Sequence, residues 1–238
     1  MPTGSFLEDV LWGQYCIFLF VRIRDDLFDG HVHGRQLQVA ADMILEEGRR
    51  AFARHFDRQS PFWSALRTLL AGTQKAIAEV DMLQRRLMPP QVILLHYAKV
   101  SAILKIGLAA VCIQYDRRNQ YKQIAACFDE IATAGHIVDD LEDVDEDLRR
   151  KRFNYVAAMI VRKSRAETSN RDRDLHIAQT LLYRDGTARI MRDVRLHLTR
   201  AEEALQGLRL PEVRAYLRMQ RANVELLAQS LQRRCIPR

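Results

Sequence analysis

The sequence predicts an all-α fold, a single-domain antiparallel bundle of helices that covers residues 1–238. Two observations predict this class. The chain has ten Gly and six Pro in 238 residues, roughly 7% against an average near 12%, and tight turns between strands need more of both. Helix start and stop signals follow one another along the chain, whereas no strand-and-turn pattern, internal repeat or long linker interrupts them.

The first helix is predicted from Ser5, because Ser5 and Glu8 have the spacing of a capping box. It carries the apolar run of residues 15–21, and a helix that is apolar on every side is expected at the centre of a bundle. Ser60 and Pro61 have the residue types of an N-cap and a first helical position. Further helices are expected over residues 37–56, 61–87, 91–115, 120–150, 174–184, 187–205 and 212–232, with a loop over residues 164–173.

The charge and the cysteines limit the class of protein. A formal net charge of +7 suits an anionic partner such as phosphate, nucleic acid or a lipid headgroup. Cys16, Cys112 and Cys127 lie in apolar surroundings and no cysteines have CxxC spacing, so we expect reduced core thiols rather than a zinc site. The N-terminus lacks the basic region of a secretory signal. These features favour a cytoplasmic protein.

Residues 91–115 are apolar enough to be taken for a membrane span. They contain Lys99 and Lys105, and a lysine near the centre of a bilayer costs about 2.5–3.5 kcal/mol. We therefore favour a buried helix within a large helical domain.

Two aspartate clusters are the most informative feature of the sequence. Their aspartates are Asp25, Asp26 and Asp29 in the first cluster, and Asp139, Asp140, Asp143 and Asp147 in the second. Residues four apart on an α-helix lie about 40° from each other, so each cluster predicts a stripe of carboxylates on one helix face. Each cluster also ends a very apolar helix.

Ionised carboxylates beside an apolar core are unfavourable unless a positive charge neutralises them. Mg²⁺ does this well, because it accepts one or two protein carboxylates and completes its shell with water or phosphate oxygens. Two solvated acidic helix ends are the alternative explanation. The presence of two such clusters in a chain with a net positive charge favours a site for Mg²⁺ and a diphosphate.

On these residues the sequence resembles the class I isoprenoid synthase superfamily, which includes trans-prenyl diphosphate synthases, squalene and phytoene synthases, and class I terpene cyclases. Residues 25–29, Asp-Asp-Leu-Phe-Asp, match its first aspartate motif, and residues 138–143 look like its second. Asp139, Asp143 and Asp147 also have the spacing of the metal-binding triad of the cyclases.

Two further segments carry the resemblance. Residues 143–152 are similar to a segment of phytoene synthases, and residues 99–104 resemble the prenyl synthase segment whose lysine binds diphosphate. The resemblance covers about residues 5–154. It implies that the helix bundle is of the isoprenoid synthase type and surrounds an apolar central cavity.

The resemblance implies a role for each matching residue. The residues expected to act in catalysis are Asp25, Asp29, Asp139, Asp143 and Lys99. The expected Mg²⁺ ligands are Asp25, Asp26, Asp29, Asp139, Asp140, Asp143 and Asp147, with Asp26 and Asp140 further from the metal because each points about 100° from its stripe. The residues expected to bind the diphosphate are Lys99, Arg35, Arg149, Arg150 and Arg152. Gln14, Phe18 and Val21, on the helix face of Asp25, are expected to line the pocket for the prenyl chain.

The activity that the resemblance implies is Mg²⁺-dependent ionisation of an allylic prenyl diphosphate, with about three Mg²⁺ ions per site. Pyrophosphate leaves, and the carbocation cyclises or eliminates a proton, as in a terpene synthase. The implied partner is the prenyl diphosphate substrate. No nucleic acid partner is expected; a homodimer and peripheral membrane contact through the lipid substrate are further expectations.

Departures from the family pattern keep two alternatives open. Arg35 stands alone where elongases carry adjacent arginines, His136 replaces a Gln before the second motif, and Arg22 occupies a position that is commonly apolar. The first motif begins at residue 25, without the longer helical stretch that holds the isopentenyl diphosphate site of elongases. The alternatives are a trans-prenyl diphosphate synthase, for elongation or head-to-head condensation with a partner subunit, and a non-catalytic regulatory protein of the same fold.

Overall fold

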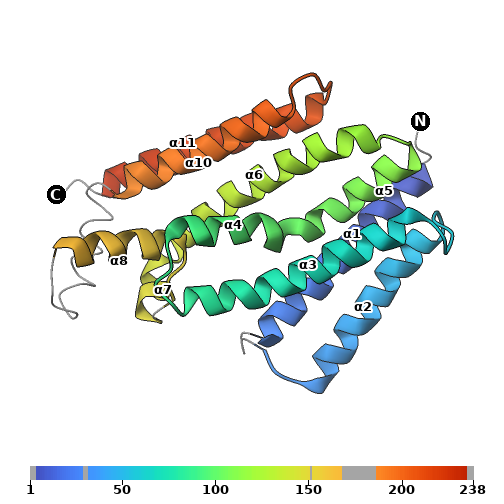
Figure 1. Ribbon diagram of the computed structural model, residues 1–238, viewed down its shortest axis with the longest axis horizontal. Coiled ribbons are helices and arrows are strands. Elements are labelled where there is room, and N and C mark those ends of the chain that lie inside the picture. Colours follow the sequence, from blue (N-terminus) through green and yellow to red (C-terminus); the bar gives the residue numbers. More distant parts are fainter. Residues whose placement is uncertain (1–3, 29–31, 151, 168–185, 235–238) are drawn as a thin grey trace. The chain divides into compact units, whose positions relative to one another are not determined.

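The secondary structure confirms the all-α class (Figure 1). The computed structural model describes residues 4–28, 32–150, 152–167 and 186–234. These residues form α-helices and one 3₁₀ helix, and no strand occurs among them. The predicted helix over residues 174–184 and most of the predicted loop over residues 164–173 lie outside the described residues.

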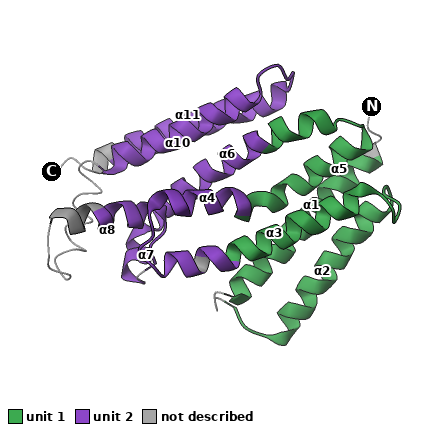
Figure 2. Ribbon diagram, in the orientation of Figure 1, with its two compact units in different colours: residues 1–77, 100–125 green, residues 78–99, 126–238 purple. Residues whose placement is uncertain are grey.

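The contacts between Cα atoms divide the chain into two compact units (Figure 2). Unit 1 comprises residues 1–77 and 100–125, and unit 2 comprises residues 78–99 and 126–238. Each unit is described below by itself. The expectation of one domain stays a prediction.

Unit 1 is built from the N-terminal helices and a second segment of the chain. It contains α1 (Gly4–Phe28), α2 (Arg35–Ala53), the 3₁₀ helix η1 (Ser101–Lys105), α5 (Ile106–Gln114) and the first parts of α3 (Pro61–Gln84) and α6 (Arg118–Glu142). Its core includes a cluster of aromatic rings: the fully buried ring of Phe62 lies 4.3 Å from that of Phe56 and 4.7 Å from that of Phe52, centroid to centroid.

Two glycines let α1 and α2 approach closely. A Cβ atom added at Gly13 of α1 would lie 2.6 Å from Cε2 of Phe52. A Cβ atom added at Gly48 of α2 would lie 2.9 Å from Cβ of Cys16 and 3.1 Å from the backbone oxygen of Gly13. Glycine is therefore required at this crossing for its lack of a side chain.

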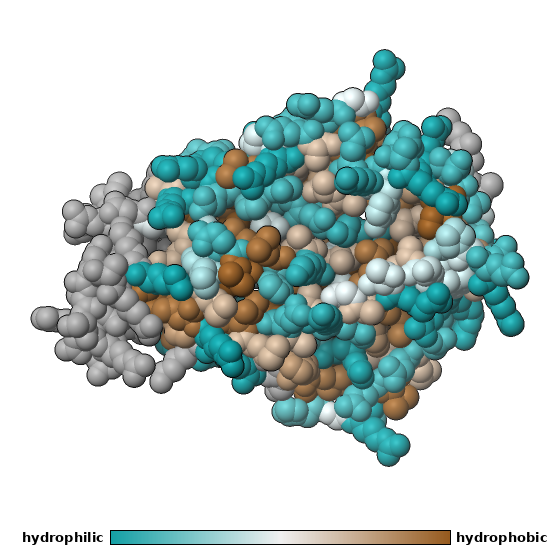
Figure 3. Space-filling view, in the orientation of Figure 1, coloured by the Kyte–Doolittle hydropathy of each residue, from teal (hydrophilic) through white to brown (hydrophobic). Residues whose placement is uncertain are grey.

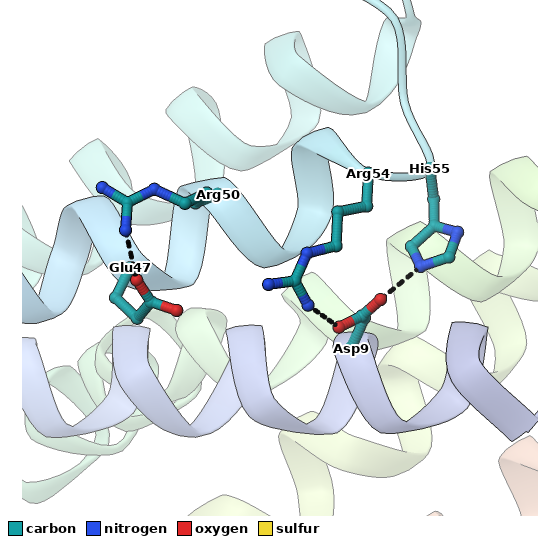
Figure 4. Close-up of polar contacts among 5 residues, drawn as sticks. All are labelled: Asp9, Glu47, Arg50, Arg54 and His55. Carbon is teal, nitrogen blue, oxygen red and sulfur yellow. Dashed lines mark hydrogen bonds and ion pairs between the residues drawn. The ribbon is translucent and has the colours of Figure 1, made fainter.

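Polar contacts join the first turns of α1 to the end of α2 (Figure 4). The Asp9 carboxylate accepts a hydrogen bond from Arg54 at 2.5 Å, and its other oxygen lies 2.7 Å from Nε2 of His55. These hydrogen bonds, led by that with His55, lower the pKa of Asp9. The Glu47–Arg50 ion pair, at 2.7 Å, lies within α2 and joins no second element.

The sequence predicts that α1 is buried on all sides, but in the structure only one of its faces is buried. Phe6, Val10, Ile17, Phe20 and Val21 are buried in the core of unit 1. The opposite face is exposed and carries the large apolar side chains of Leu7, Leu11, Trp12, Tyr15 and Phe18. The sequence could not show this, because both faces of the helix are apolar.

The predicted helix over residues 91–115 is not continuous. It consists of α4 (Pro90–Val100), η1 and α5. The side-chain amide of Gln14 spans the interruption within unit 1: its Nε2 donates to the backbone oxygen of Ile103 at 3.0 Å, and its Oε1 accepts from the backbone N–H of Gly107 at 2.8 Å. Gln14 therefore pairs backbone groups that a regular α-helix would pair internally.

Residues Pro90–Gln114 are the one stretch of the described chain that is long and apolar enough to cross a membrane, by length and composition only. Core helices of soluble proteins meet the same criteria. Part of the apolar surface of α4 is exposed, including Leu95, and hydrophobic side chains are visible over α4 in the space-filling view (Figure 3).

Unit 2 contains the C-terminal helices. They are α7 (Val144–Arg149), α8 (Tyr155–Glu167), α10 (Thr187–Ala204) and α11 (Pro211–Arg234), together with α4 and the later parts of α3 and α6. Ile137 of α6, Ile190 and Leu198 of α10 and Leu217 of α11 lie in one buried core. A hydrogen bond of 2.6 Å between His197 and Glu130 also joins α10 to α6.

The sequence analysis missed α8 although a local signal was present. The side chain of Asn154 accepts a hydrogen bond from the backbone N–H of Ala157 at 2.7 Å, which is the geometry of a helix N-cap. The apolar residues that follow are buried in the core of unit 2. An Asn before an apolar run predicts such a start.

The three thiols that the structure describes are free and buried, as the sequence predicts for Cys16, Cys112 and Cys127. Burial raises the pKa of each. They therefore behave as apolar core residues.

Substitution of Gly13 by Ala tests the crossing of α1 and α2. We expect Gly13→Ala to lower the free energy of unfolding by about 1–3 kcal/mol, because the added methyl group overlaps the packed ring of Phe52. Gly72→Ala is the matched control: a Cβ at Gly72 meets nothing within 4 Å, and Ala is favoured over Gly within a helix. Urea denaturation measures both variants; equal stability of the two would contradict the packing argument.

Candidate functional site

The second aspartate cluster surrounds a buried carboxylate in unit 2. Asp140, in the last turn of α6, is 9% exposed. Its Oδ2 accepts a hydrogen bond from the hydroxyl of Tyr97 at 2.5 Å and another from the backbone N–H of Tyr155 at 2.9 Å. This one oxygen therefore joins α6 to α4 and to the start of α8.

Asn154 and Tyr155 extend this network. Nδ2 of Asn154 donates to the carboxylate of Asp147 at 2.5 Å and to the backbone oxygen of Asp140 at 3.3 Å. The hydroxyl of Tyr155 donates to Asp193 of α10 at 2.6 Å. The loop between α7 and α8 is thus fixed against the acidic end of α6.

The predicted helix over residues 120–150 ends early, and α7 begins after Asp143. A continuous helix would place several carboxylates within its C-terminal half, where the helix dipole disfavours negative charge. The break instead puts Asp145, Glu146 and Asp147 in the first turn of α7, where the dipole favours them.

The carboxylate stripe survives this break. The backbone N–H of Asp143 donates to the oxygen of Asp139 at 2.9 Å, and that of Asp147 donates to the oxygen of Asp143 at 2.9 Å. Because both bonds join residues four apart, the three aspartates still follow one another by single helical turns. Asp139 and Asp143 are exposed, whereas Asp147 is half-buried.

The carboxylates of this cluster disfavour one another's charge. Partial burial and then the charge of Asp143 raise the pKa of Asp139 and of Asp147, although Arg152 opposes the rise at Asp147. Burial raises the pKa of Asp140 to about 7, against the hydrogen bonds from Tyr97 and Tyr155. A cation bound at Asp139, Asp143 and Asp147 would relieve this repulsion.

An apolar cavity lies next to the stripe in unit 2. It has a volume of about 320 Å³ and lies between α6, α10 and α11. Asp139 and Glu142 are its acidic lining residues. The apolar part of the lining includes Ile131, Val138, Val194, Leu198, Val224 and Leu227, and α11 adds Tyr216, Gln220 and Asn223.

The arginines near the stripe that are predicted to bind diphosphate have different contacts. Arg152 is half-buried, and its backbone N–H donates to the oxygen of Asp147 at 2.8 Å. Arg150 pairs with Glu146 at 2.7 Å, and Nε of Arg149 donates to the backbone oxygen of Asp145 at 3.1 Å. Of the described arginines expected to bind the diphosphate, Arg152 is therefore the one that interacts with the stripe, through a backbone hydrogen bond to Asp147 and through its charge.

Lys99 is exposed near the end of α4. Tyr97, two residues earlier, faces Asp140 and His136 of α6. Residues two apart on a helix lie about 200° from each other, so Lys99 lies on a different side of α4 from this contact. Its assignment to the diphosphate stays a prediction.

The first aspartate motif lies in unit 1. Asp25 and Asp26 belong to the last turn of α1, where Arg22 lies 3.7 Å from the first and 3.4 Å from the second. Asp29 lies outside the described residues. Arg35 is exposed at the first position of α2.

The three predicted pocket residues of α1 have different surroundings. Val21 is buried in the core of unit 1, Phe18 is exposed, and the side-chain amide of Gln14 is hydrogen-bonded to backbone groups. Their role in binding a prenyl chain, and the joining of both motifs in one site, stay predictions.

The predicted Mg²⁺ ligands that the structure describes do not form a closed cage. Within residues 4–28, 32–150, 152–167 and 186–234, no group of three or more His, Cys, Asp or Glu side chains is close enough to hold a metal ion by itself. Mg²⁺ held with a diphosphate needs only one or two protein carboxylates. The exposed carboxylates of Asp139 and Asp143 fit a site in which Mg²⁺ is held jointly by protein carboxylates and a diphosphate.

Sequence reasoning missed the residues that position the stripe, namely Tyr97, Asn154 and Tyr155. Tyr97 and Asp140 are 43 positions apart, so no local spacing connects them.

Comparison of the chain with models of protein families, with curated proteins and with solved structures finds no match. The resemblance to isoprenoid synthases therefore depends on the motifs of the sequence.

Removal of the Asp140 carboxylate tests the network. Asp140→Ala removes the acceptor of the Tyr97 hydroxyl and leaves the Tyr155 N–H with the longer bond of 3.3 Å to the Tyr97 oxygen. We expect a loss of about 1–3 kcal/mol in the free energy of unfolding. Asp140→Asn keeps an oxygen that can accept both bonds and should lose much less. Thermal unfolding compares the two variants, and equal losses would contradict the hydrogen-bonding role.

The raised pKa of Asp140 also predicts a pH dependence of stability. The folded state binds the Asp140 proton more tightly than the unfolded state, whose aspartates keep a pKa near 3.8. Stability should therefore fall as the pH rises from about 4 to about 7. Urea denaturation across this range should show a smaller fall for Asp140→Asn than for the wild type; the same fall in both would contradict the assignment.

Proposed function

We propose that the protein is a Mg²⁺-dependent enzyme of the class I isoprenoid synthase type, which ionises one allylic prenyl diphosphate and releases pyrophosphate. The observation that carries this proposal is the stripe of Asp139, Asp143 and Asp147 beside an apolar cavity that Asp139 helps to line. A prenyl diphosphate needs a metal-binding carboxylate site for its diphosphate and an apolar cavity for its hydrocarbon chain, and the two must be adjacent.

The residues of the stripe have separate parts in this proposal. Asp139 and Asp143 are the exposed carboxylates that would hold Mg²⁺, with Asp147 positioned by Asn154. When bound, Mg²⁺ neutralises the negative charge that develops on the leaving pyrophosphate. The positive charge of Arg152 acts on the Asp147 carboxylate and lowers its pKa.

The reaction breaks the bond between the allylic carbon and the diphosphate oxygen. The electron pair of that bond leaves with the pyrophosphate, and the allylic carbon is left with a positive charge. The apolar lining keeps water from this carbon. The cation then loses a proton to give an alkene, or an internal double bond attacks it to form a ring.

A non-catalytic role is the second candidate, and one contact favours it. Arg22 lies within ion-pair distance of Asp25 and Asp26, so the first motif already has a positive charge beside it. In such a protein the helices would serve as a surface for a regulatory partner.

Release of pyrophosphate tests the proposed function. We expect the purified protein to release pyrophosphate from geranyl, farnesyl or geranylgeranyl diphosphate when Mg²⁺ is present, and to stop when the metal is chelated. Asp139→Asn and Asp143→Asn should lower the rate by about 100-fold or more, because they remove charge that acts on the leaving group.

Asp42→Asn is the control, since Asp42 is an exposed carboxylate on α2 that belongs to neither motif. Its rate should equal that of the wild type. Incorporation of labelled isopentenyl diphosphate into a longer chain would assign the protein to the prenyl synthases instead. No release from any of the three substrates would favour the non-catalytic role.

A further inference from the structure

Of the described helices, α1 (Figure 1, dark blue) carries the most large apolar side chains on its exposed surface. Leu7, Leu11, Trp12, Tyr15 and Phe18 are between 40% and 69% exposed. On a helix, all of them lie within about 80° of Tyr15. We call these five residues the α1 stripe.

The area of the α1 stripe is large enough for an interface. Aromatic side chains have about 150–250 Å² of surface each, so the stripe exposes on the order of 500 Å². Two copies of it together reach the area of about 1,000 Å² that a specific interface needs. An apolar patch of this size is near the upper end for a monomeric protein, and such patches are often functional.

The charges on this face of α1 can pair with those of the same face in a second, antiparallel copy of the helix. Glu8 lies near the start of the stripe and is exposed, and the side chain of Arg22, beyond its other end, is 55% exposed. Each lies seven positions from Tyr15, and both lie within about 20° of it around the helix. In an antiparallel pair centred on Tyr15, Glu8 of each copy therefore lies opposite Arg22 of the other. Arg22 also lies within ion-pair distance of Asp25 and Asp26 of its own helix.

The apolar residues match in the same arrangement. Leu11 lies at the level of Leu19 of the other copy, and Trp12 lies at the level of Phe18. The sequence of this face thus places apolar residues against apolar residues and opposite charges at both ends.

We propose that the occupant of the α1 stripe is a second copy of this chain, with the two α1 helices antiparallel and centred on Tyr15. This interface uses Phe18, which the resemblance assigns to the prenyl pocket, and Arg22, which lies beside Asp25 and Asp26. It uses none of Asp139, Asp143 and Asp147, on which the proposed function rests.

Sedimentation equilibrium of the full chain tests the interface. We expect a mass that rises toward that of two chains with concentration, and a dissociation constant that Leu11→Glu raises at least about tenfold. The matched control is Leu95→Glu, because Leu95 of α4 is 68% exposed and Leu11 is 69% exposed. The control should dimerise like the wild type, and circular dichroism should show equal helix content in all three proteins.

Disulfide cross-linking tests the register. Helices that pack 8–10 Å apart, with Cα atoms about 2.3 Å from each axis, bring the central Cα atoms of an antiparallel pair to roughly 3.4–5.4 Å. The upper part of this range overlaps the Cα separations of about 4.4–6.8 Å that a disulfide spans. The fourth cysteine of the sequence, Cys235, lies outside the described residues and is replaced by Ser in this experiment. In this background, Tyr15→Cys should cross-link to itself under oxidation. Met43→Cys, on the exposed surface of α2, should not.

Three results would overturn the proposal. They are the mass of one chain at every concentration, a dimer that Leu11→Glu leaves unchanged, and a dimer in which Tyr15→Cys fails to cross-link. Binding of the wild-type monomer, but not of Leu11→Glu, to vesicles of anionic phospholipid would identify a membrane as the occupant instead.

Discussion

A buried carboxylate, Asp140, determines the arrangement of the acidic end of α6. Its Oδ2 accepts hydrogen bonds from Tyr97 of α4 and from the N-terminus of α8, while Asn154 binds its backbone oxygen. Buried charge is unfavourable unless such partners are present. These bonds fix where α6 ends, and so they position the exposed neighbours Asp139 and Asp143.

The carboxylates at the acidic end of α6 lower the stability of the folded state near neutral pH. The pKa values of Asp139, Asp140 and Asp147 are all raised, which means that the folded state disfavours their charges near neutral pH. Unfavourable electrostatics of this kind are concentrated at functional sites. A fold that only needed stability would gain from a neutral residue at the exposed position of Asp139.

The sequence predicted the helical class and most helix positions, because Gly and Pro content, caps and apolar runs are local signals. It also located the aspartate stripe, whose steps of four residues survive the break at Asp143. It did not predict that break, nor the 3₁₀ segment whose backbone groups bind Gln14. The contacts of Tyr97 with Asp140 and of Gln14 with Ile103 join residues far apart in the chain, and helix periodicity carries no information about them.

The central claim is that the carboxylate stripe binds Mg²⁺ together with a diphosphate. Its most direct test is thermal unfolding of the wild type and of Asp139→Asn with Mg²⁺, with inorganic pyrophosphate, and with both. A ligand that binds only the folded state raises its stability. We predict a clear rise in Tm for the wild type with both ligands together, little change with either alone, and no rise for Asp139→Asn. No rise in the wild type with both ligands, or an equal rise in Asp139→Asn, would contradict the claim.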